Sequence, residues 1–596
     1  MDTQTTNPLI DFVYNKGFEA YHRDLKAVAE HDLFRPHHGL NMRQIGELAY
    51  QRSRHIHSQI EPPLEVLARP ERLFALAEWA GIQDVSCFSL VMVHYNLTMG
   101  TFFDHGLKQA GLAGFVEELN NLTSFGPYMA TELGYGNNVA SLKTQAVYSH
   151  EDRCFYLSTP DLLSQKYMSY SGFSHIPKIA VVMARLNIKD KDVGVFPFAV
   201  RLSDEQGLRP GISAVPCPEK PVQGLDNGLT AFDRVRVELD HILMGDMAEI
   251  TEEGEFVPHI KNVRARFLKS MSRIMPGRLC VASSGLGGGK ASLYIALKYA
   301  QNRLTNAPGA GSTEIINFSA YQRDVLVNLA RTYAMIALTN DGKTRFVAEP
   351  ETPDAELMNQ INITKALVTW EMTDVIANCR ERCGAQGIFS VNKITDYISL
   401  LQGLVTAEGD NQVLIATAAG QLINQAAPEL DPHVEDEVFS AANLASLACL
   451  RERALHQDIA NRRDAFDGSF FDEWNLISND AIALARLRGM RLALNALRNW
   501  RTGCAQSDDK LQRLAQLFGL YILQQDAAWY ALNGDISQQH ILSVSAHMDE
   551  LCRSLVGDVN SLIDAFGYDE AFFHSPLCYP QYEQHFTDYS KRAGEV

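Results

Sequence analysis

The sequence predicts a mainly α-helical fold with a β-domain inserted between helical regions. Up to about residue 125, apolar residues recur at the spacing of helix faces. From about 126 to 245, short apolar runs alternate with Gly, Pro and Asn turn signals, a pattern typical of strands. From about 260 to the end, long helical periodicities return. We therefore expect four domains, over 1–125, 126–250, 251–428 and 429–596.

The N-terminal region predicts helices over 45–60 and 64–82. Apolar residues repeat every three to four positions in both segments. Pro62 and Pro63 separate them, because proline lacks a backbone N–H and clashes with the preceding helical turn.

The central region predicts short strands joined by turns. Val235, Val237 and Leu239 alternate with charged residues, as expected of a half-buried strand. The tripeptide at 226–228, Asp-Asn-Gly, is one of several turn signals. Apolar runs predict further strands over 154–157, 179–186 and 195–202.

The C-terminal half predicts a succession of helices. Gly384 follows the last periodic residue of one of them and is suited to a helix C-terminus, because glycine adopts the left-handed conformation there. Helices are expected over 278–303, 319–338, 355–382, 410–425, 438–461, 472–501, 508–533 and 537–566.

The composition excludes several classes of function. The 596 residues carry a formal net charge of −18, so no basic excess is available to neutralise the phosphates of a nucleic acid. No apolar stretch reaches the length of a membrane span, and the first eleven residues lack the apolar core of a signal peptide. The ten cysteines lack the paired spacing of zinc sites or disulfide frameworks. We expect a cytoplasmic protein with neither a nucleic acid nor a membrane as partner.

Two further sequence patterns do not indicate a nucleotide-binding or metal site. The glycines of 285–290, Gly-Leu-Gly-Gly-Gly-Lys, lack the first glycine and the final Ser or Thr of a P-loop, and we interpret them as sites of close helix packing. The N-terminal histidines lack carboxylates or cysteines at ligand spacing, so no metal site is expected. These histidines are His31, His37, His38, His55 and His57.

Residues 406–411, Thr-Ala-Glu-Gly-Asp-Asn, are the most informative segment. Glu408 lies between two apolar runs, and Asp410-Asn411 after it is a good start for a helix. A carboxylate at such a turn can project into an apolar slot, where its charged form is disfavoured and it becomes a proton acceptor near neutral pH. The alternative is that Glu408 is a solvated loop residue near a helix start.

Several motifs in order resemble one enzyme family. Residues 131–138, Thr-Glu-Leu-Gly-Tyr-Gly-Asn-Asn, resemble the Thr-Glu-Leu-Gly-His-Gly-Ser-Asn signature of the acyl-CoA oxidases, flavin enzymes of the acyl-CoA dehydrogenase superfamily. Residues 383–387, Cys-Gly-Ala-Gln-Gly, resemble the family's Cys-Gly-Gly-His-Gly. Residues 408–411, Glu-Gly-Asp-Asn, resemble its Glu-Gly-Glu/Asp-Asn. Further similarity lies at 155–166, 225–236, 299–303 and 562–567, so nearly the whole chain is covered.

The resemblance implies a fold and a reaction. The fold would be a helical domain, a β-barrel-like domain, a helical bundle carrying the catalytic glutamate, and a second C-terminal helical domain. Glu408 would be the base that removes the α-proton of an acyl thioester, while its own backbone N–H helps to stabilise the enolate. The β-hydrogen would pass as hydride to FAD, and dioxygen would reoxidise the flavin and give hydrogen peroxide.

The resemblance also implies which residues bind FAD. In the family, the segment that residues 167–171 resemble lies against the flavin, so the resemblance adds Met168 and Tyr170 to the expected FAD contacts. Asp410 and Gln412 would lie near the ribityl or adenosine part. Arg303, with the turn at Gly384 and Gly387, would reach the FAD diphosphate of a partner subunit, which implies a homodimer. The residues beside the isoalloxazine or the substrate would be Tyr128, Ala130, Thr131, Gly136 and Asn137.

The chain departs from the family at the same places. The family's Trp-Trp-Pro-Gly-Gly is replaced by Tyr-Met-Ser-Tyr-Ser at 167–171, and Ala385 and Gln386 replace Gly-His. Tyr170 adds bulk where glycine permits close approach to the flavin. We therefore expect a pocket remodelled for a specialised acyl thioester, carried by CoA or by an acyl-carrier protein.

Three other functions stay open at this stage. A dehydrogenase would pass its electrons to a flavoprotein partner, although the additional domain over 429–596 favours the oxidase branch. A monooxygenase would incorporate oxygen into the product. A non-catalytic subunit of a heteromeric oxidase would have no need of a base at Glu408.

Overall fold

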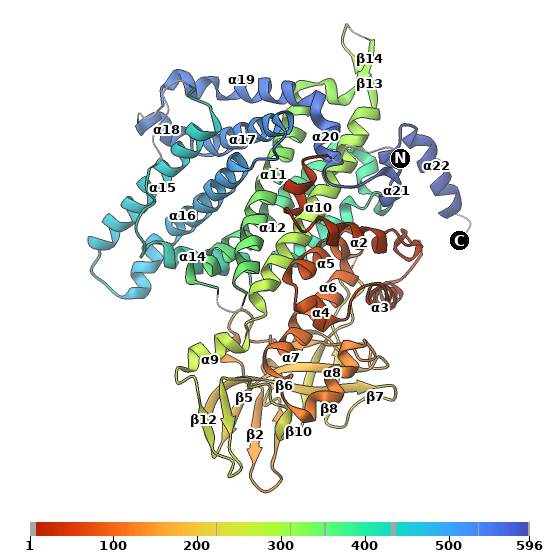
Figure 1. Cartoon of the computed structure of the whole chain (residues 1–596), viewed down its shortest axis with the longest axis vertical. Helices are drawn as coiled ribbons and strands as arrows, with labels where there is room; N and C mark the ends of the chain where they lie inside the picture. Colours follow the sequence, from red (N-terminus) through yellow and green to blue (C-terminus); the bar gives the residue numbers. More distant parts are fainter. Residues whose placement is uncertain are drawn as a thin grey trace. The chain divides into compact units, whose positions relative to one another are not determined.

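The structure, a computed structural model, contains two compact units. It describes residues 7–37, 39–221, 223–309, 311–350, 353–430, 437–533 and 536–593, so His38 of the histidine-rich stretch lies outside the described residues. One unit is Gly39–Cys280, and the other combines Met1–His38 with Val281–Val596 (Figure 1). The bounds expected for four domains stay a prediction.

The unit Gly39–Cys280 begins with helices. Helix α3 (Met42–Gln59) confirms the helix expected over 45–60, and Asn41 and Gln44 form a capping box at its start. The segment 64–82 is not one helix: it divides into α4 (Pro63–Leu67) and α5 (Pro70–Gln83). Pro70 takes the first position of α5, where its missing N–H is tolerated. The helices that follow are α6 (Val85–Met92), a π-helix (Val93–Met99), α7 (Gly100–His105) and α8 (Ala113–Asn120).

Two sheets and a hairpin follow in the same unit. The larger sheet has the order β10-β3-β2-β5-β6-β7, and β1 (Tyr128–Met129) pairs in parallel with β5. The smaller sheet has the order β4-β9-β8, with β4 (Lys166–Tyr170), β8 (Ile212–Pro216) and β9 (Asn227–Phe232). All four strands predicted by apolar runs and alternation are present in the larger sheet. Its bounds are β2 (Gln145–Ser149), β3 (Cys154–Ser158), β5 (Lys178–Ile188), β6 (Lys191–Asp204), β7 (Gly207–Leu208) and β10 (Val235–Glu238); β11 (Ala248–Ile250), β12 (Phe256–Pro258) and α9 (Val263–Ser270) complete the unit.

Long helices dominate the other unit, which is called the long-helix unit below. The long helices α10 (Ile274–Asn302), which begins in the first unit, α11 (Ser319–Ala348) and α12 (Ala355–Arg382) agree with the helices expected there, and α12 has the predicted bounds. A hairpin of β13 (Leu304–Ala307) and β14 (Gly311–Glu314), which the sequence did not predict, projects between α10 and α11 (Figure 1). The other helices are α1 (Ile10–Tyr14), α2 (Glu19–Ala29), α13 (Ile394–Leu404), α14 (Asn411–Leu422), α15 (Ala441–Asp464), α16 (Phe470–Asn499), α17 (Ala505–Gln525), α18 (Ala527–Asn533), α19 (Gln538–Leu555), α20 (Val559–Asp564), α21 (Glu570–Phe573) and α22 (Tyr582–Ala593).

One hydrophobic core spans the expected domain boundary near residue 428. It joins Ala366 of α12 and Ala418 of α14 to Ile459 of α15 and Ala481 of α16, all buried. The helices on the two sides of residue 428 therefore stabilise each other by burying a common apolar surface.

The glycines of 285–290 lie inside α10 and serve close packing, which confirms the interpretation from the sequence. A Cβ atom on Gly289 would lie 2.3 Å from Sδ of Met372 on α12, and one on Gly288 would lie 3.4 Å from Cβ of Tyr397 on α13. Among the described helices, none is long and apolar enough to span a bilayer. The described part of the chain also contains no group of three His, Cys, Asp or Glu side chains that could hold a metal ion.

Candidate functional site

The candidate residues are divided between the two units. Glu408, the proposed base, lies in the long-helix unit together with Asp410, Gln412, Arg303, Gly384 and Gly387. The unit Gly39–Cys280 holds Tyr128, Ala130, Thr131, Gly136, Asn137, Met168 and Tyr170.

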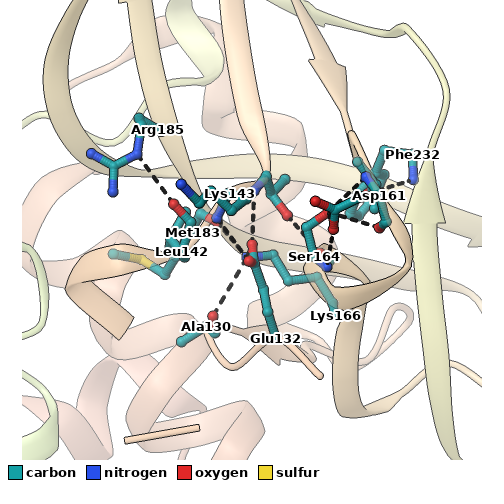
Figure 2. Close-up of polar contacts among 12 residues, drawn as sticks. Ala130, Glu132, Leu142, Lys143, Asp161, Ser164, Lys166, Met183, Arg185 and Phe232 are labelled. Carbon is teal, nitrogen blue, oxygen red and sulfur yellow. Dashed lines mark hydrogen bonds and ion pairs between the residues drawn. The ribbon is translucent and has the colours of Figure 1, made fainter. Parts of the chain in front are cut away.

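A buried ion pair fixes the segment that carries the first of these residues. Glu132 and Lys166 have fully buried side chains, and Nζ of Lys166 donates to Oε1 of Glu132 at 3.0 Å (Figure 2). Glu132 also accepts the backbone N–H groups of Lys143 and Thr144 at 2.7 and 2.8 Å. Lys166 donates further to the carbonyl oxygen of Met183 at 2.7 Å and weakly to that of Ala130 at 3.4 Å. The pair is thus supplied with the hydrogen bonds that a buried charge requires.

The inward position of this ion pair shows which neighbouring side chains of the two segments face outward. Glu132 and Lys166 are bridged as antiparallel neighbours, and the backbone N–H of Tyr167 donates to the carbonyl of Thr131 at 3.0 Å. Since successive side chains along a strand point to opposite faces, Thr131 and Tyr167 lie on the face opposite the ion pair. Thr131 is half-buried and Tyr167 is 38% exposed. Burial lowers the pKa of Lys166 to about 8, although Glu132 opposes the shift.

A β-bulge presents Met168. Strand β4 pairs with β9 through Lys166 and Thr230 and then through Ser169 and Gly228, so β4 holds one extra residue. Met168 lies there with a φ of 59°, is 42% exposed, and accepts a hydrogen bond from Nδ2 of Asn227 at 2.6 Å.

The two serines beside Tyr170 are buried and form hydrogen-bond contacts in the interior. Ser169 and Ser171 are buried, and Oγ1 of Thr230 lies 3.4 Å from the first hydroxyl and donates to the second at 2.8 Å. Tyr170, which is half-buried, lies between these two serines in the chain, so its side chain points to the opposite face from theirs. The partly exposed side chains of this segment are therefore Tyr167, Met168 and Tyr170, whereas the hydroxyl groups of the two serines are buried.

The loop after Thr131 is open. Gly136 is exposed, and a Cβ atom on it would meet no atom within 4 Å. Asn137 is exposed with a φ of 57°, a left-handed conformation that asparagine tolerates better than most residues. The loop therefore leaves Gly136 and Asn137 accessible, after β1, whose Tyr128 pairs with Val181 of β5.

Glu408 lies on a strained turn. It is half-buried between α13 and α14 with a φ of 56°, and Gly409 has a φ of 110°. A left-handed conformation costs about 1–2 kcal/mol for a residue with a Cβ atom, so the surroundings must hold it. Asp410 caps α14 by accepting the N–H groups of Gln412 and Val413 at 2.9 and 3.3 Å, as the sequence predicts for a helix start.

The remaining candidates lie at the ends of α10 and α12. Arg303 follows α10 and is half-buried, and its carbonyl accepts the N–H of Ile315 at 2.9 Å. Gly384 follows α12 with a φ of 60°. Gly387 is buried, and a Cβ atom on it would lie 2.4 Å from the carbonyl oxygen of Arg380. Between them, Oε1 of Gln386 is buried and accepts no hydrogen bond from a described residue.

Two buried lysines that contact the candidate segments were not identified from the sequence. Lys166 appeared only within a motif, and Lys365 of α12 was not noticed, although a lysine between Ile363 and Leu367 is the signal that could have found it. Nζ of Lys365 donates to the carbonyl of Gly409 at 2.7 Å, next to Glu408.

Two family models match the chain from residue 272 onward. The model described as "Acyl-CoA oxidase, C-alpha1 domain" matches residues 272–423, and that described as "Acyl-CoA oxidase" matches residues 440–580. Together they include Lys365, Gly384 and Glu408.

Whole-chain comparisons give the same result. The chain is 26% identical over 542 residues to peroxisomal acyl-coenzyme A oxidase 3 of Arabidopsis thaliana, covering 85% of this chain and 79% of that protein. The crystal structure of acyl-CoA oxidase 1 from Yarrowia lipolytica has a TM-score of 0.85 at 20% identity, over 99% of this chain and 92% of that one. Acyl-CoA oxidase-2 of Caenorhabditis elegans, bound with FAD, ascaroside-CoA and ATP, has a TM-score of 0.80 at 17% identity, over 99% of this chain and 93% of that one.

Proposed function

As a divergent member of the acyl-CoA oxidase family, the chain is an oxidoreductase, and we propose that it uses FAD and dioxygen to introduce a Cα–Cβ double bond into an acyl thioester. The acyl group loses one hydrogen from each carbon, and dioxygen takes up both as hydrogen peroxide. The observation that carries the proposal is the half-buried Glu408, held on a strained turn in residues 408–411, which resemble the family's motif of the catalytic glutamate.

Glu408 is the proposed base. The α-proton of a thioester is a weak acid, so its removal needs a carboxylate in place and a donor for the enolate oxygen. The carboxylate of Glu408 takes the proton, and the backbone N–H of the same residue is proposed to donate to the thioester carbonyl. Backbone strain of this kind occurs mainly at functional sites, which favours the role of a reagent over that of a solvated loop residue for Glu408.

FAD fits the residues present. When bound, FAD accepts the β-hydrogen as hydride. In the unit Gly39–Cys280, the outward face with Thr131, Tyr167 and Met168 offers half-exposed aromatic and apolar side chains to a planar ring. In the long-helix unit, the buried Oε1 of Gln386 lacks a donor among the described residues, and a ribose hydroxyl or an adenine amino group can supply one.

The remaining FAD contacts are proposed from the family positions. Tyr128, Ala130, Gly136, Asn137 and Tyr170 would surround the flavin or the substrate. Asp410 and Gln412 would lie near the ribityl or adenosine part. Arg303, Gly384 and Gly387 would act on a partner subunit's cofactor in a homodimer.

The substrate is proposed to be a specialised acyl-CoA or acyl-carrier-protein thioester. Tyr170 stands where the resembling family segment has a glycine and adds bulk there, and a structural neighbour was crystallised with ascaroside-CoA. The ten free cysteines favour a reducing compartment, and we propose the cytoplasm. Equal turnover of straight-chain acyl-CoA and of branched or polar acyl thioesters would argue against a specialised substrate.

The Glu408→Gln variant tests the proposed base. We expect turnover to fall about 10²–10⁴-fold, because the amide cannot accept the proton. The matched control is Glu429→Gln, which neutralises an exposed carboxylate of the same unit. Peroxide formation under air without another acceptor identifies the oxidase, whereas turnover only with an added electron acceptor would identify a dehydrogenase. An unchanged rate for Glu408→Gln would remove Glu408 from the mechanism.

A further inference from the structure

Lys365 is a buried cation beside the Glu408 turn. It lies in the middle of α12, with a relative exposure of 0%. Its ammonium donates to three oxygens: the carbonyl of Gly409 at 2.7 Å, Oδ1 of Asn411 at 2.9 Å and the carbonyl of Val405 at 3.4 Å. An ammonium carries three N–H groups, so one side chain can donate to all of these oxygens.

The three acceptors bracket Glu408 on both sides. Val405 directly follows α13, Gly409 is the neighbour of Glu408, and Asn411 begins α14. The N–H of Asn411 also donates to the carbonyl of Val405 at 3.0 Å, which closes the turn on itself. One side chain from α12 therefore holds both ends of the segment that carries Glu408.

Asn411 also connects the turn to α12 through hydrogen bonds of its own. It is 2% exposed, and its Nδ2 donates to Oγ1 of Thr369 at 2.8 Å and to the carbonyl of Ala366 at 3.2 Å. The hydroxyl of Thr369 donates in turn to the carbonyl of Lys365 at 2.9 Å. The amide of Asn411 is thus oriented so that its oxygen faces the ammonium.

We propose that Lys365 is a positioning residue for catalysis, which holds the Glu408 turn in its left-handed conformation and so aims the carboxylate; this rests on the proposed role of Glu408 as base. The strain at Glu408 has to be balanced by contacts that exist only in this geometry. The hydrogen bonds from Lys365 to Gly409 and Val405 have that property, because a change in the conformation of Glu408 would move these two carbonyls relative to each other. A methionine could fill the same space but could not make these directional contacts.

The Lys365→Met variant tests the proposal against a purely structural role. We expect kcat to fall about 100-fold with KM nearly unchanged, because a displacement of about 1 Å at the reacting group has that effect. In the Glu408→Gln background, Lys365→Met should lower the residual rate no further, since it acts only through Glu408. Exchange of the thioester's α-hydrogen into D2O, followed by mass spectrometry of the recovered substrate without dioxygen, should fall by the same factor as kcat.

The matched control is Lys343→Met. Lys343 lies on α11, in the same unit, and is also buried at 3% exposure. Its loss should lower the melting temperature while kcat per bound flavin stays at the wild-type value. If Lys365→Met behaves like this control, with wild-type kcat per flavin and wild-type α-hydrogen exchange, the proposal is overturned.

The two proposals fail in different ways. Full turnover by Glu408→Gln would refute the base, whatever Lys365→Met does. An inactive Glu408→Gln beside a fully active Lys365→Met would refute only the positioning role. If Lys365→Met does not fold, Lys365→Gln replaces it: the glutamine amide is one bond shorter and cannot reach both sides of the turn, so kcat should again fall, and a wild-type kcat would overturn the inference.

Discussion

Removing one partner of the Glu132–Lys166 pair should destabilise the unit Gly39–Cys280 strongly. Both side chains are fully buried. In Lys166→Met, the Glu132 carboxylate keeps the N–H groups of Lys143 and Thr144 but loses its opposite charge. Breaking such a buried pair costs about 3–5 kcal/mol, because an uncompensated charge remains in the interior.

The free-energy cost of breaking the pair determines the expected shift in melting temperature. For a unit of this size, each 1 kcal/mol lowers the melting temperature by about 2–4 °C, so Lys166→Met should melt about 10 °C lower. The Glu132→Gln/Lys166→Met double variant carries neither charge and should be less destabilised than the sum of the two single variants. Hydrogen exchange should also rise in the two peptides that contain Thr131 and Tyr167, whose pairing the ion pair supports.

Calorimetry and hydrogen-exchange mass spectrometry measure these effects. Glu255→Gln is the control, because it breaks the Lys189–Glu255 pair, whose side chains are 52% and 55% exposed. Exposed pairs contribute about 0–1 kcal/mol, so this variant should melt within about 4 °C of the wild type. If Lys166→Met and Glu255→Gln melted at the same temperature, the buried pair would not be what stabilises this segment.

Two further predictions concern pH and glycine. The pKa of Lys166 is lowered to about 8 from 10.5, so between these values the unfolded chain binds more protons than the folded one. The stability of the wild type relative to Lys166→Met should therefore rise with pH in this window. Urea unfolding at pH 7.5 and 10 measures this difference, and it would show no such rise if the lysine titrates normally. Gly387→Ala should destabilise the end of α12 by clearly more than Gly384→Ala. The first places a Cβ atom 2.4 Å from the carbonyl of Arg380, whereas the second costs only the left-handed conformation, about 1–2 kcal/mol; equal melting temperatures would contradict this ranking.

Local patterns were sufficient for most elements. The bounds of α12 follow from its apolar period and from Gly384 after it, and both are properties of neighbouring residues. The strands β5 and β6 were visible as apolar runs because both faces of the central strands are buried. The helix expected over 64–82 is divided before Pro70, because proline cannot continue a helix. The apolar period runs on across this helix break, so periodicity alone predicted one helix. The hairpin β13–β14 was missed because Thr-Asn-Ala-Pro-Gly carries a turn signal without an apolar alternation.

The candidate site divides in the same way. The sequence by itself determined that Glu408 stands between a helix end and a helix start, since Asp410 and the flanking apolar runs are its chain neighbours. Only the tertiary structure decided what holds that turn: Lys365 is 43 positions before Glu408, and hydrogen bonds between helices depend on packing rather than on local spacing. It likewise decided that Lys166 meets Glu132 inside the sheet, because strand register places residues face to face that no sequence period connects.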